Sequence, residues 1–192
     1  MAEVLLFHHA YGLTAGVRSF AARLEAAGHT VHVPDLYDGA VFDTLGSGIA
    51  NAKKIGFDTV LDRGRRAAEG LPAELVYAGF SLGVLPAQSL AQTRPAARGA
   101  LLMDACLPAE EFGDGWPAGL PAQVHGMEAD PEFADSGDLD AARALVAATP
   151  ETELFLYPGR QHVFADDSLP GYDENAATLL TERVLAFLTR VG

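Results

Sequence analysis

The sequence predicts an α/β fold in which a mostly parallel sheet of about six strands carries helices on both faces. Short apolar runs alternate along the chain with segments of helical period, the order that crossover helices between parallel strands produce. The apolar runs also lack the strict alternation of a half-exposed strand, as expected when both faces of a sheet are covered. The length suits one core and no linker is visible, so we expect a single domain over residues 1–192.

The first half of the chain follows this alternation, with one exception. Predicted strands cover Glu3–His8, His29–Val33 and Glu74–Gly79, and predicted helices cover Thr14–Ala27, Asp58–Glu69 and Leu82–Gln92. The exception is Asp35–Gly56, which is rich in Gly and Asp and has no clear period. We predict a loop with one helical turn there.

The second half completes the sheet. Predicted strands cover Ala100–Asp104, Ala122–Met127 and Thr152–Tyr157, and predicted helices cover Asp138–Ala148 and Asp173–Arg190. A Pro- and Gly-rich loop, Ala105–Leu120, separates the first two of these strands. Right-handed crossovers place ligands outside the carboxyl ends of parallel strands, so side chains that directly follow a strand are the candidates for a site.

Composition excludes several classes of function. The chain has 13 basic and 26 acidic residues, a formal charge of -13, which would repel nucleic acid and anionic membranes. Cys106 is the only cysteine, so no disulfide can form within the chain. The N-terminus lacks the basic start of a signal peptide, and no apolar stretch is long enough to span a membrane. We expect a cytoplasmic protein, a monomer or homodimer, with a small molecule as its partner.

The segment Gly79-Phe80-Ser81-Leu82-Gly83 lies between a predicted strand and a predicted helix. This is the nucleophile-elbow pattern, in which a sharp turn exposes the serine oxygen and leaves room only for small residues on either side. Random order in a chain of this composition would give about 0.07 such pentapeptides, and the flanking strand and helix strengthen the assignment. Ser81 is the predicted nucleophile, and the Leu82 backbone N–H is a predicted oxyanion donor.

A serine hydroxyl needs a base, and the base needs a carboxylate that orients it. His162 is the only histidine beyond the last predicted strand, and the chain order Ser…Asp…His favours it as the base. The acid should follow the strand Ala122–Met127, where Asp130 is best placed. The other candidates are Glu128, Asp135 and, after the preceding strand, Asp104.

The remaining histidines and the cysteine do not suggest a second site. His8 and His9 would point to opposite faces of a strand, and no zinc-binding or phosphate-binding motif is present, so no metal or cofactor is predicted. His125 is predicted to be a hydrogen-bonded core residue and Cys106 a buried apolar one. The second oxyanion donor should lie after the first strand, where the Ala10 N–H is the candidate.

Several stretches together resemble the dienelactone hydrolase family of α/β-hydrolases. They are FHHAYGLTAGVRSFAARLEAAGHTVHVPDLYDG, GFSLG, HGMEADPEF and YPGRQHVFADDSLPGYDENAATLLTERVLAFL, which run through nearly the whole chain. The resemblance implies Ser81 as nucleophile, Asp130 as acid and His162 as base. It also implies the backbone N–H groups of Ala10 and Leu82 as the oxyanion hole, and hydrolysis of a small ester or lactone without a metal.

The chain departs from the founding members of that family at three positions. Those members have cysteine where this chain has Ser81, glutamate where it has His9, and a substrate-binding arginine where it has Asp166. A carboxylate at position 166 would repel a carboxylate substrate, which disfavours dienelactone itself. The usual β-hairpin before the first strand is also missing, so we expect a compact α/β-hydrolase fold with six strands and no lid domain.

These observations predict a serine hydrolase that cleaves a small, neutral carboxylic ester or lactone through an acyl-enzyme. A thioesterase or small-peptide hydrolase would use the same triad, and a non-catalytic binding module on this fold is a further alternative. The loops Asp35–Gly56 and Ala105–Leu120 are predicted to border the pocket, the alternative for their aromatic residues being ordinary packing. The predicted pocket side chains are His9, Tyr11, Tyr37, Phe80, Phe112 and Trp116.

Overall fold

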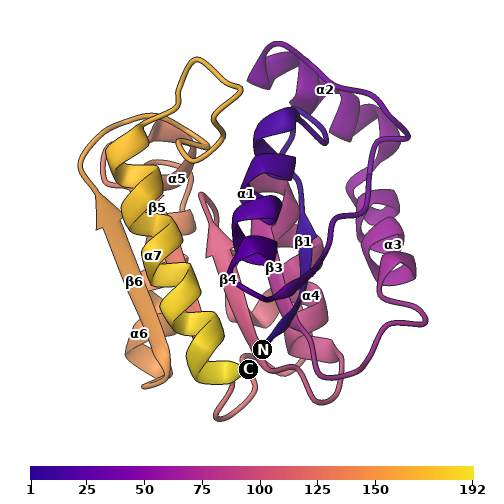
Figure 1. The fold of residues 1–192 in the computed structure, drawn as a ribbon, viewed down its shortest axis with the longest axis vertical. Helices are drawn as coiled ribbons and strands as arrows, with labels where there is room; N and C mark the ends of the chain where they lie inside the picture. Colours follow the sequence, from indigo (N-terminus) through magenta and orange to yellow (C-terminus); the bar gives the residue numbers. More distant parts are fainter.

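The six predicted strands form one parallel sheet in the computed structural model, which describes residues 1–192 (Figure 1). The strands run parallel to their neighbours in the order β2-β1-β3-β4-β5-β6. The α/β prediction is confirmed. The strand bounds are β1 (Glu3–Phe7), β2 (Thr30–His32), β3 (Val76–Phe80), β4 (Gly99–Met103), β5 (Ala122–Met127) and β6 (Thr152–Tyr157).

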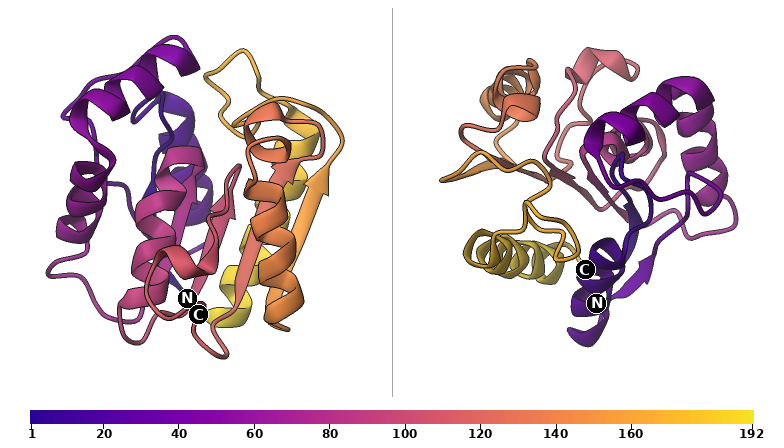
Figure 2. Two further views of the ribbon diagram at one scale, coloured as in Figure 1. Left: turned by 180° about the vertical axis from the view of Figure 1, so that it is seen from behind. Right: turned by 90° about the horizontal axis from the view of Figure 1, so that it is seen from above.

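Helices cover both faces of the sheet, as Figure 2 shows from above. Helices α1 (Ala15–Ala26) and α7 (Glu174–Val191) lie on one face. The opposite face carries α3 (Phe57–Ala67), α4 (Val84–Thr93) and α6 (Asp138–Ala148), with α2 (Leu45–Ile55) at its upper end. No helix is both long and apolar enough to cross a membrane.

Strand β1 shows how the sequence builds two cores. Leu5 and Phe7 belong to the apolar cluster on the α4 side, whereas Val4 and Leu6 belong to the cluster on the α1 and α7 side. All four side chains are fully buried. Alternate strand residues point to opposite faces, and each large apolar side chain buried in this way contributes about 2 kcal/mol. This two-sided burial explains why the strands read as continuous apolar runs.

Helix α2 corrects the prediction of a loop over Asp35–Gly56. Its sequence, LGSGIANAKKI, contains residues of low helix propensity, and it has no strong apolar period. The helix nevertheless begins at a side-chain cap, where the Ser47 N–H donates to Thr44 Oγ1, and it ends at Gly56. Tertiary packing holds it in place, because a side chain at Gly48 would bring its Cβ to 2.0 Å from the Ala10 carbonyl oxygen.

Candidate active site

Ser81 follows β3 at a sharp turn into α4. Its φ angle is 48°, a left-handed conformation that non-glycine residues rarely adopt. A Cβ at Gly79 would lie 2.2 Å from the Gly83 carbonyl oxygen, and one at Gly83 would lie 2.4 Å from the Phe7 carbonyl oxygen. The two glycines are therefore required by backbone contacts. Residues Ser81–Gly83 form a 3-10 turn, so α4 begins at Val84, slightly later than predicted.

Three side chains from three strand ends form a continuous hydrogen-bonded chain. Ser81 Oγ lies 2.7 Å from His162 Nε2, and His162 Nδ1 lies 2.6 Å from Asp130 Oδ2. The carboxylate can only accept, so Nδ1 carries the proton and Nε2 is left to accept the hydroxyl proton of Ser81. The sequence placed these residues after β3, β5 and β6, and the structure brings them together as the elbow pattern requires.

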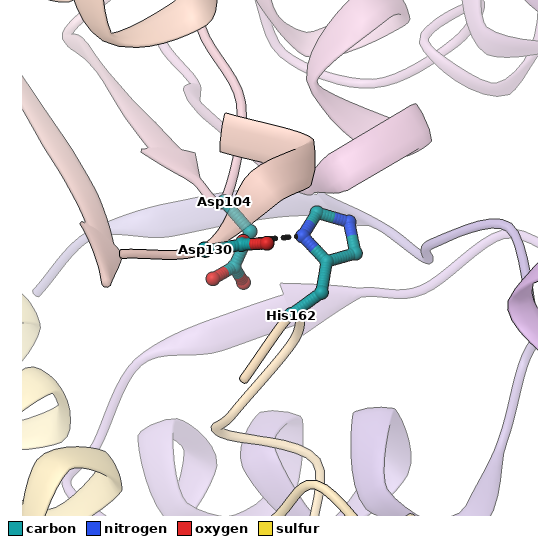
Figure 3. A group of neighbouring side chains, drawn as sticks. All are labelled: Asp104, Asp130 and His162. Carbon is teal, nitrogen blue, oxygen red and sulfur yellow. Dashed lines mark hydrogen bonds and ion pairs between the residues drawn. The ribbon is translucent and has the colours of Figure 1, made fainter. Parts of the chain in front are cut away.

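Asp130 is held firmly in position. It is fully buried, and its second oxygen accepts from the Glu132 N–H at 3.0 Å, where it caps the short helix α5 (Pro131–Ala134). The alternative acids Glu128 and Asp135 are exposed. The fourth candidate, Asp104, is buried beside the site and lies with Asp130 next to the His162 ring (Figure 3).

Charge at the site favours a protonated imidazole. Burial acts to lower the pKa of His162, but the hydrogen bond to Asp130 and the charges of Asp104, Asp130 and Glu132 outweigh it. The pKa of His162 therefore lies above its ordinary value. Burial raises the pKa of Asp104 to about 7, and the charge of Asp130 adds to this rise. The charge of His162 and a hydrogen bond from the Val163 backbone N–H oppose it.

The ligand types of Asp104, Asp130 and His162 also suit a metal ion, and one ligand atom from each lies within 4.8 Å of the others. A cation bound to all three would have to displace the proton that Nδ1 of His162 shares with Asp130. The geometry thus favours a proton over a metal between these two residues.

The loop after β1 carries the predicted second oxyanion donor. The Ala10 N–H donates to no backbone carbonyl, so it is free to bind another acceptor. Helix α2 fixes the loop from the far side through the close approach of Gly48 to the Ala10 carbonyl. Leu82, the other predicted donor, directly follows Ser81 and lines a cavity beside Ser81 and His162. The oxyanion role of both N–H groups stays a prediction.

His9 and Asp166 form a buried pair behind this loop rather than part of the pocket. His9 Nε2 lies 2.8 Å from Asp166 Oδ2, and both residues are almost fully buried. Thr14 and Ser168 also donate to the Asp166 carboxylate. The position of Asp166 does not support the expectation that it repels a carboxylate substrate, because Asp166 is buried against His9 and does not line the cavity beside Ser81. The pair instead joins the first loop to the loop that bears His162.

A cavity of about 500 Å³ opens beside Ser81 and His162. Its wall is mainly apolar, and its other charged side chains are all carboxylates, with no lysine or arginine among them. The apolar lining residues are Leu45, Ile49, Phe57, Leu82, Leu85, Ala105 and Leu107, and the acidic ones are Asp104, Glu111, Glu132 and Asp138.

None of the side chains predicted to line the pocket is among these residues. Tyr37 packs on the core side of α2, with its hydroxyl 3.3 Å from the Gly48 carbonyl oxygen. Phe80 points to the opposite face of the sheet, against Phe20. Both predicted segments, Asp35–Gly56 and Ala105–Leu120, contribute side chains to the cavity, although the first contains a helix and their aromatic residues pack elsewhere.

The other predicted pocket residues also have structural contacts. Phe112 is buried, the Trp116 ring N–H donates to the Leu120 carbonyl at 2.9 Å, and Tyr11 packs edge-on against His9. Part of the apolar wall comes instead from Leu45 and Ile49 of α2, the helix that the sequence did not reveal. Its cap at Thr44 and the glycine after its last turn were the available signals.

His125 and Cys106, which were predicted to be core residues without a role in a site, are both buried. His125 is fully buried, and its Nδ1 lies 2.9 Å from the Tyr157 hydroxyl. Burial lowers the pKa of His125 to about 3, so the ring is neutral. Cys106 is buried, and burial raises the pKa of its thiol to about 12.

Comparison with known proteins gives a consistent result. The model of the dienelactone hydrolase family matches residues 1–192. No curated protein matches the chain by sequence. A dienelactone hydrolase-like promiscuous phosphotriesterase from metagenomic libraries superimposes with a TM-score of 0.78 at 20% identity, over 100% of this chain and 87% of its own.

Two further solved structures share the fold. TT1662 from Thermus thermophilus has a TM-score of 0.70 at 17% identity, over 98% of this chain and 88% of its own. Esterase 2 from Thermogutta terrifontis, in a form phosphonylated by cyclosarin, has a TM-score of 0.66 at 19% identity, over 100% of this chain and 83% of its own. At these identities the likeness concerns the fold.

Proposed function

Because the chain belongs to the dienelactone hydrolase family and has the α/β-hydrolase fold, we propose that it hydrolyses a small, neutral carboxylic ester or lactone. The proposal is supported above all by the hydrogen-bonded chain from Ser81 through His162 to Asp130. A hydroxyl, an imidazole and a carboxylate in this order and at these distances are the parts of a nucleophilic triad.

The first half of the reaction forms an acyl-enzyme. His162 Nε2 takes the hydroxyl proton of Ser81 as Oγ attacks the ester carbonyl carbon. Negative charge then develops on the carbonyl oxygen, which the backbone N–H groups of Ala10 and Leu82 would stabilise. When the tetrahedral intermediate collapses, His162 gives its proton to the departing alcohol oxygen, and Ser81 keeps the acyl group.

The second half releases the acid. A water molecule takes the place of the alcohol and loses a proton to His162 Nε2 as it attacks the acyl carbon. The second tetrahedral intermediate returns the proton to Ser81 Oγ and frees the carboxylic acid. Asp130 stabilises the positively charged imidazole in both halves and keeps the ring in the required tautomer.

The cavity wall argues for a neutral substrate. Apolar side chains such as Leu45, Ile49 and Leu85 suit an acyl or alkyl chain, and a volume of about 500 Å³ suits a small molecule. The carboxylates Glu111, Glu132 and Asp138 would disfavour an anionic ester, and no basic side chain lies near to bind one. Two solved structures of the same fold are named as an esterase and a phosphotriesterase, which is consistent with an ester as the substrate.

A panel of p-nitrophenyl esters tests the proposal. Acyl chains of increasing length should be compared with a thioester, a dienelactone, and a hemisuccinate ester that carries one negative charge. We expect turnover of short neutral esters and at least about tenfold lower kcat/KM for the hemisuccinate, from charge repulsion in the cavity. If the thioester is cleaved faster than every oxygen ester of the panel, the substrate is a thioester and the proposed ester specificity is wrong.

Covalent labelling tests the nucleophile directly. A fluorophosphonate probe should label the protein, Ser81→Ala should abolish labelling, and Ser19→Ala on α1 should leave it unchanged. Folded protein that reacts neither with the probe nor with any ester of the panel would exclude a serine hydrolase.

A further inference from the structure

Asp104 is a buried carboxylate to which no side chain donates a hydrogen bond. It follows the end of β4 and is 1% exposed, and the backbone N–H of Val163 is the only donor that acts on it. Buried carboxylates in proteins are normally paired or fully hydrogen-bonded, because an unpaired charge is costly to remove from water. The arrangement therefore lowers stability, and a function is the natural reason for it.

The backbone at Asp104 is strained as well. Its φ angle is 61°, and Val163, directly after His162, has a φ angle of 52°, an unusual value for a β-branched residue. Ser81, at 48°, is the third such residue at this site, and the other two non-glycine residues with positive φ, Asp38 and Ala96, do not line the cavity. Strained residues of this kind persist where the surrounding structure enforces them, and they collect at functional sites.

The titratable groups around Asp104 indicate which side chain its charge would stabilise. An Asp104 oxygen, an Asp130 oxygen and a His162 ring nitrogen lie within 4.8 Å of one another, and Figure 3 shows both carboxylates on the Nδ1 side of the ring. The other titratable groups that act on these residues are Tyr157, Glu132 and Asp138, none of which is cationic. His162 is thus the one group here that becomes positively charged.

We propose that Asp104 is a second carboxylate for His162, which stabilises the imidazolium ring and takes over its orientation when Asp130 is lost. The inference rests on the proposed function, in which the ring accepts the hydroxyl proton of Ser81 and returns it to the leaving group. His162 Nδ1 donates its hydrogen bond to Asp130 and not to Asp104. Asp104 is proposed to act through the ring, so it is a positioning residue.

The first test measures the ring itself. An NMR titration of the His162 imidazole, assigned by its loss in His162→Gln, gives its pKa in the parent, in Asp104→Asn and in Asp135→Asn. Asn keeps the shape of Asp104 and removes its charge, so the pKa of His162 should fall by about one unit. The exposed Asp135 provides the matched control, for which no change is expected.

An unchanged His162 pKa in Asp104→Asn would overturn the proposal. Asp104→Ala, which also lacks the charge, should give the same fall in pKa and serves if the amide disturbs folding. This titration needs no substrate. It therefore reports on Asp104 even if no ester of the panel is cleaved, which would refute the proposed hydrolysis separately.

The second test removes Asp130. The rate of labelling by the fluorophosphonate probe should fall by about 10²-fold in Asp130→Ala, and by about 10⁴-fold in Asp130→Ala/Asp104→Ala, the loss typical of a triad without its acid. Asp130→Ala/Asp135→Ala should match the single variant. Equal rates in Asp130→Ala and Asp130→Ala/Asp104→Ala would show that Asp104 gives no support to the ring.

Discussion

Asp166→Asn removes the carboxylate that joins the His162 loop to the Ala10 loop, and its cost can be worked out from the contacts. Burial acts to raise the pKa of Asp166, but hydrogen bonds from His9, Ser168 and Thr14 outweigh it and lower the pKa to about 2. Against 3.8 in the unfolded chain, this difference corresponds to about 2 kcal/mol of unfolding free energy at pH 7.

The sign of the pH dependence follows from the lowered pKa. The stabilisation is complete above the unfolded-state value of 3.8 and is lost as the pH falls through about 2 in the folded state. By the same relation, about 1 kcal/mol remains at pH 3. Asp166→Asn should therefore be less stable than the parent by about 2 kcal/mol at pH 7 and by about 1 kcal/mol at pH 3.

Urea unfolding followed by circular dichroism at the two pH values measures this difference. The control is Asp167→Asn, next in sequence, which loses only a half-exposed ion pair with Arg23 and should cost less than about 1 kcal/mol. A stability gap for Asp166→Asn that is the same at pH 3 as at pH 7, or no larger than that of the control, would refute the reasoning.

Three further predictions concern the site and the core. Gly83→Ala places a Cβ 2.4 Å from the Phe7 carbonyl oxygen, so it should lower stability by about 3 kcal/mol, and an unchanged Tm would contradict the tight elbow. The kcat/KM profile should fall at acidic pH with a midpoint above 6.5, because the pKa of His162 is raised and only its neutral ring accepts a proton; a lower midpoint would argue against this base. The Cys106 thiol, with a pKa raised to about 12, should react with iodoacetamide at pH 8 only after unfolding, and rapid alkylation of the native protein would disprove its burial.

The residues of the site were predictable because their positions depend on topology. Ser81, Asp130 and His162 each follow a strand, and a parallel sheet brings the carboxyl ends of its strands to one edge. Which carboxylate receives the hydrogen bond was less certain, because Asp104 also ends a strand at this edge. Only the directions of the side chains separate its role from that of Asp130.

The part of the pocket wall that α2 provides was not predictable as a helix, because tertiary contacts stabilise that helix. Helix α2 contains Gly46, Gly48 and Asn51, whose low propensity hid it, and the fit of Gly48 against Ala10 has no signal in the sequence. The burial of Asp166 away from the cavity was not predictable either, because it depends on the path of the loop after His162. The chain turns sharply at Val163, and residues four apart on one loop consequently face different parts of the molecule.

The buried carboxylate of Asp166 also limits how this sequence can diverge. A Cβ at Gly16 would lie 1.7 Å from Asp166 Oδ1, and the hydrogen bonds from His9 and Thr14 prevent the carboxylate from moving aside. Alanine at position 16 thus becomes acceptable only after position 166 has changed to a smaller residue. The order of the two substitutions matters, so related chains should vary at these positions together, and a chain that keeps Asp166 should keep Gly16.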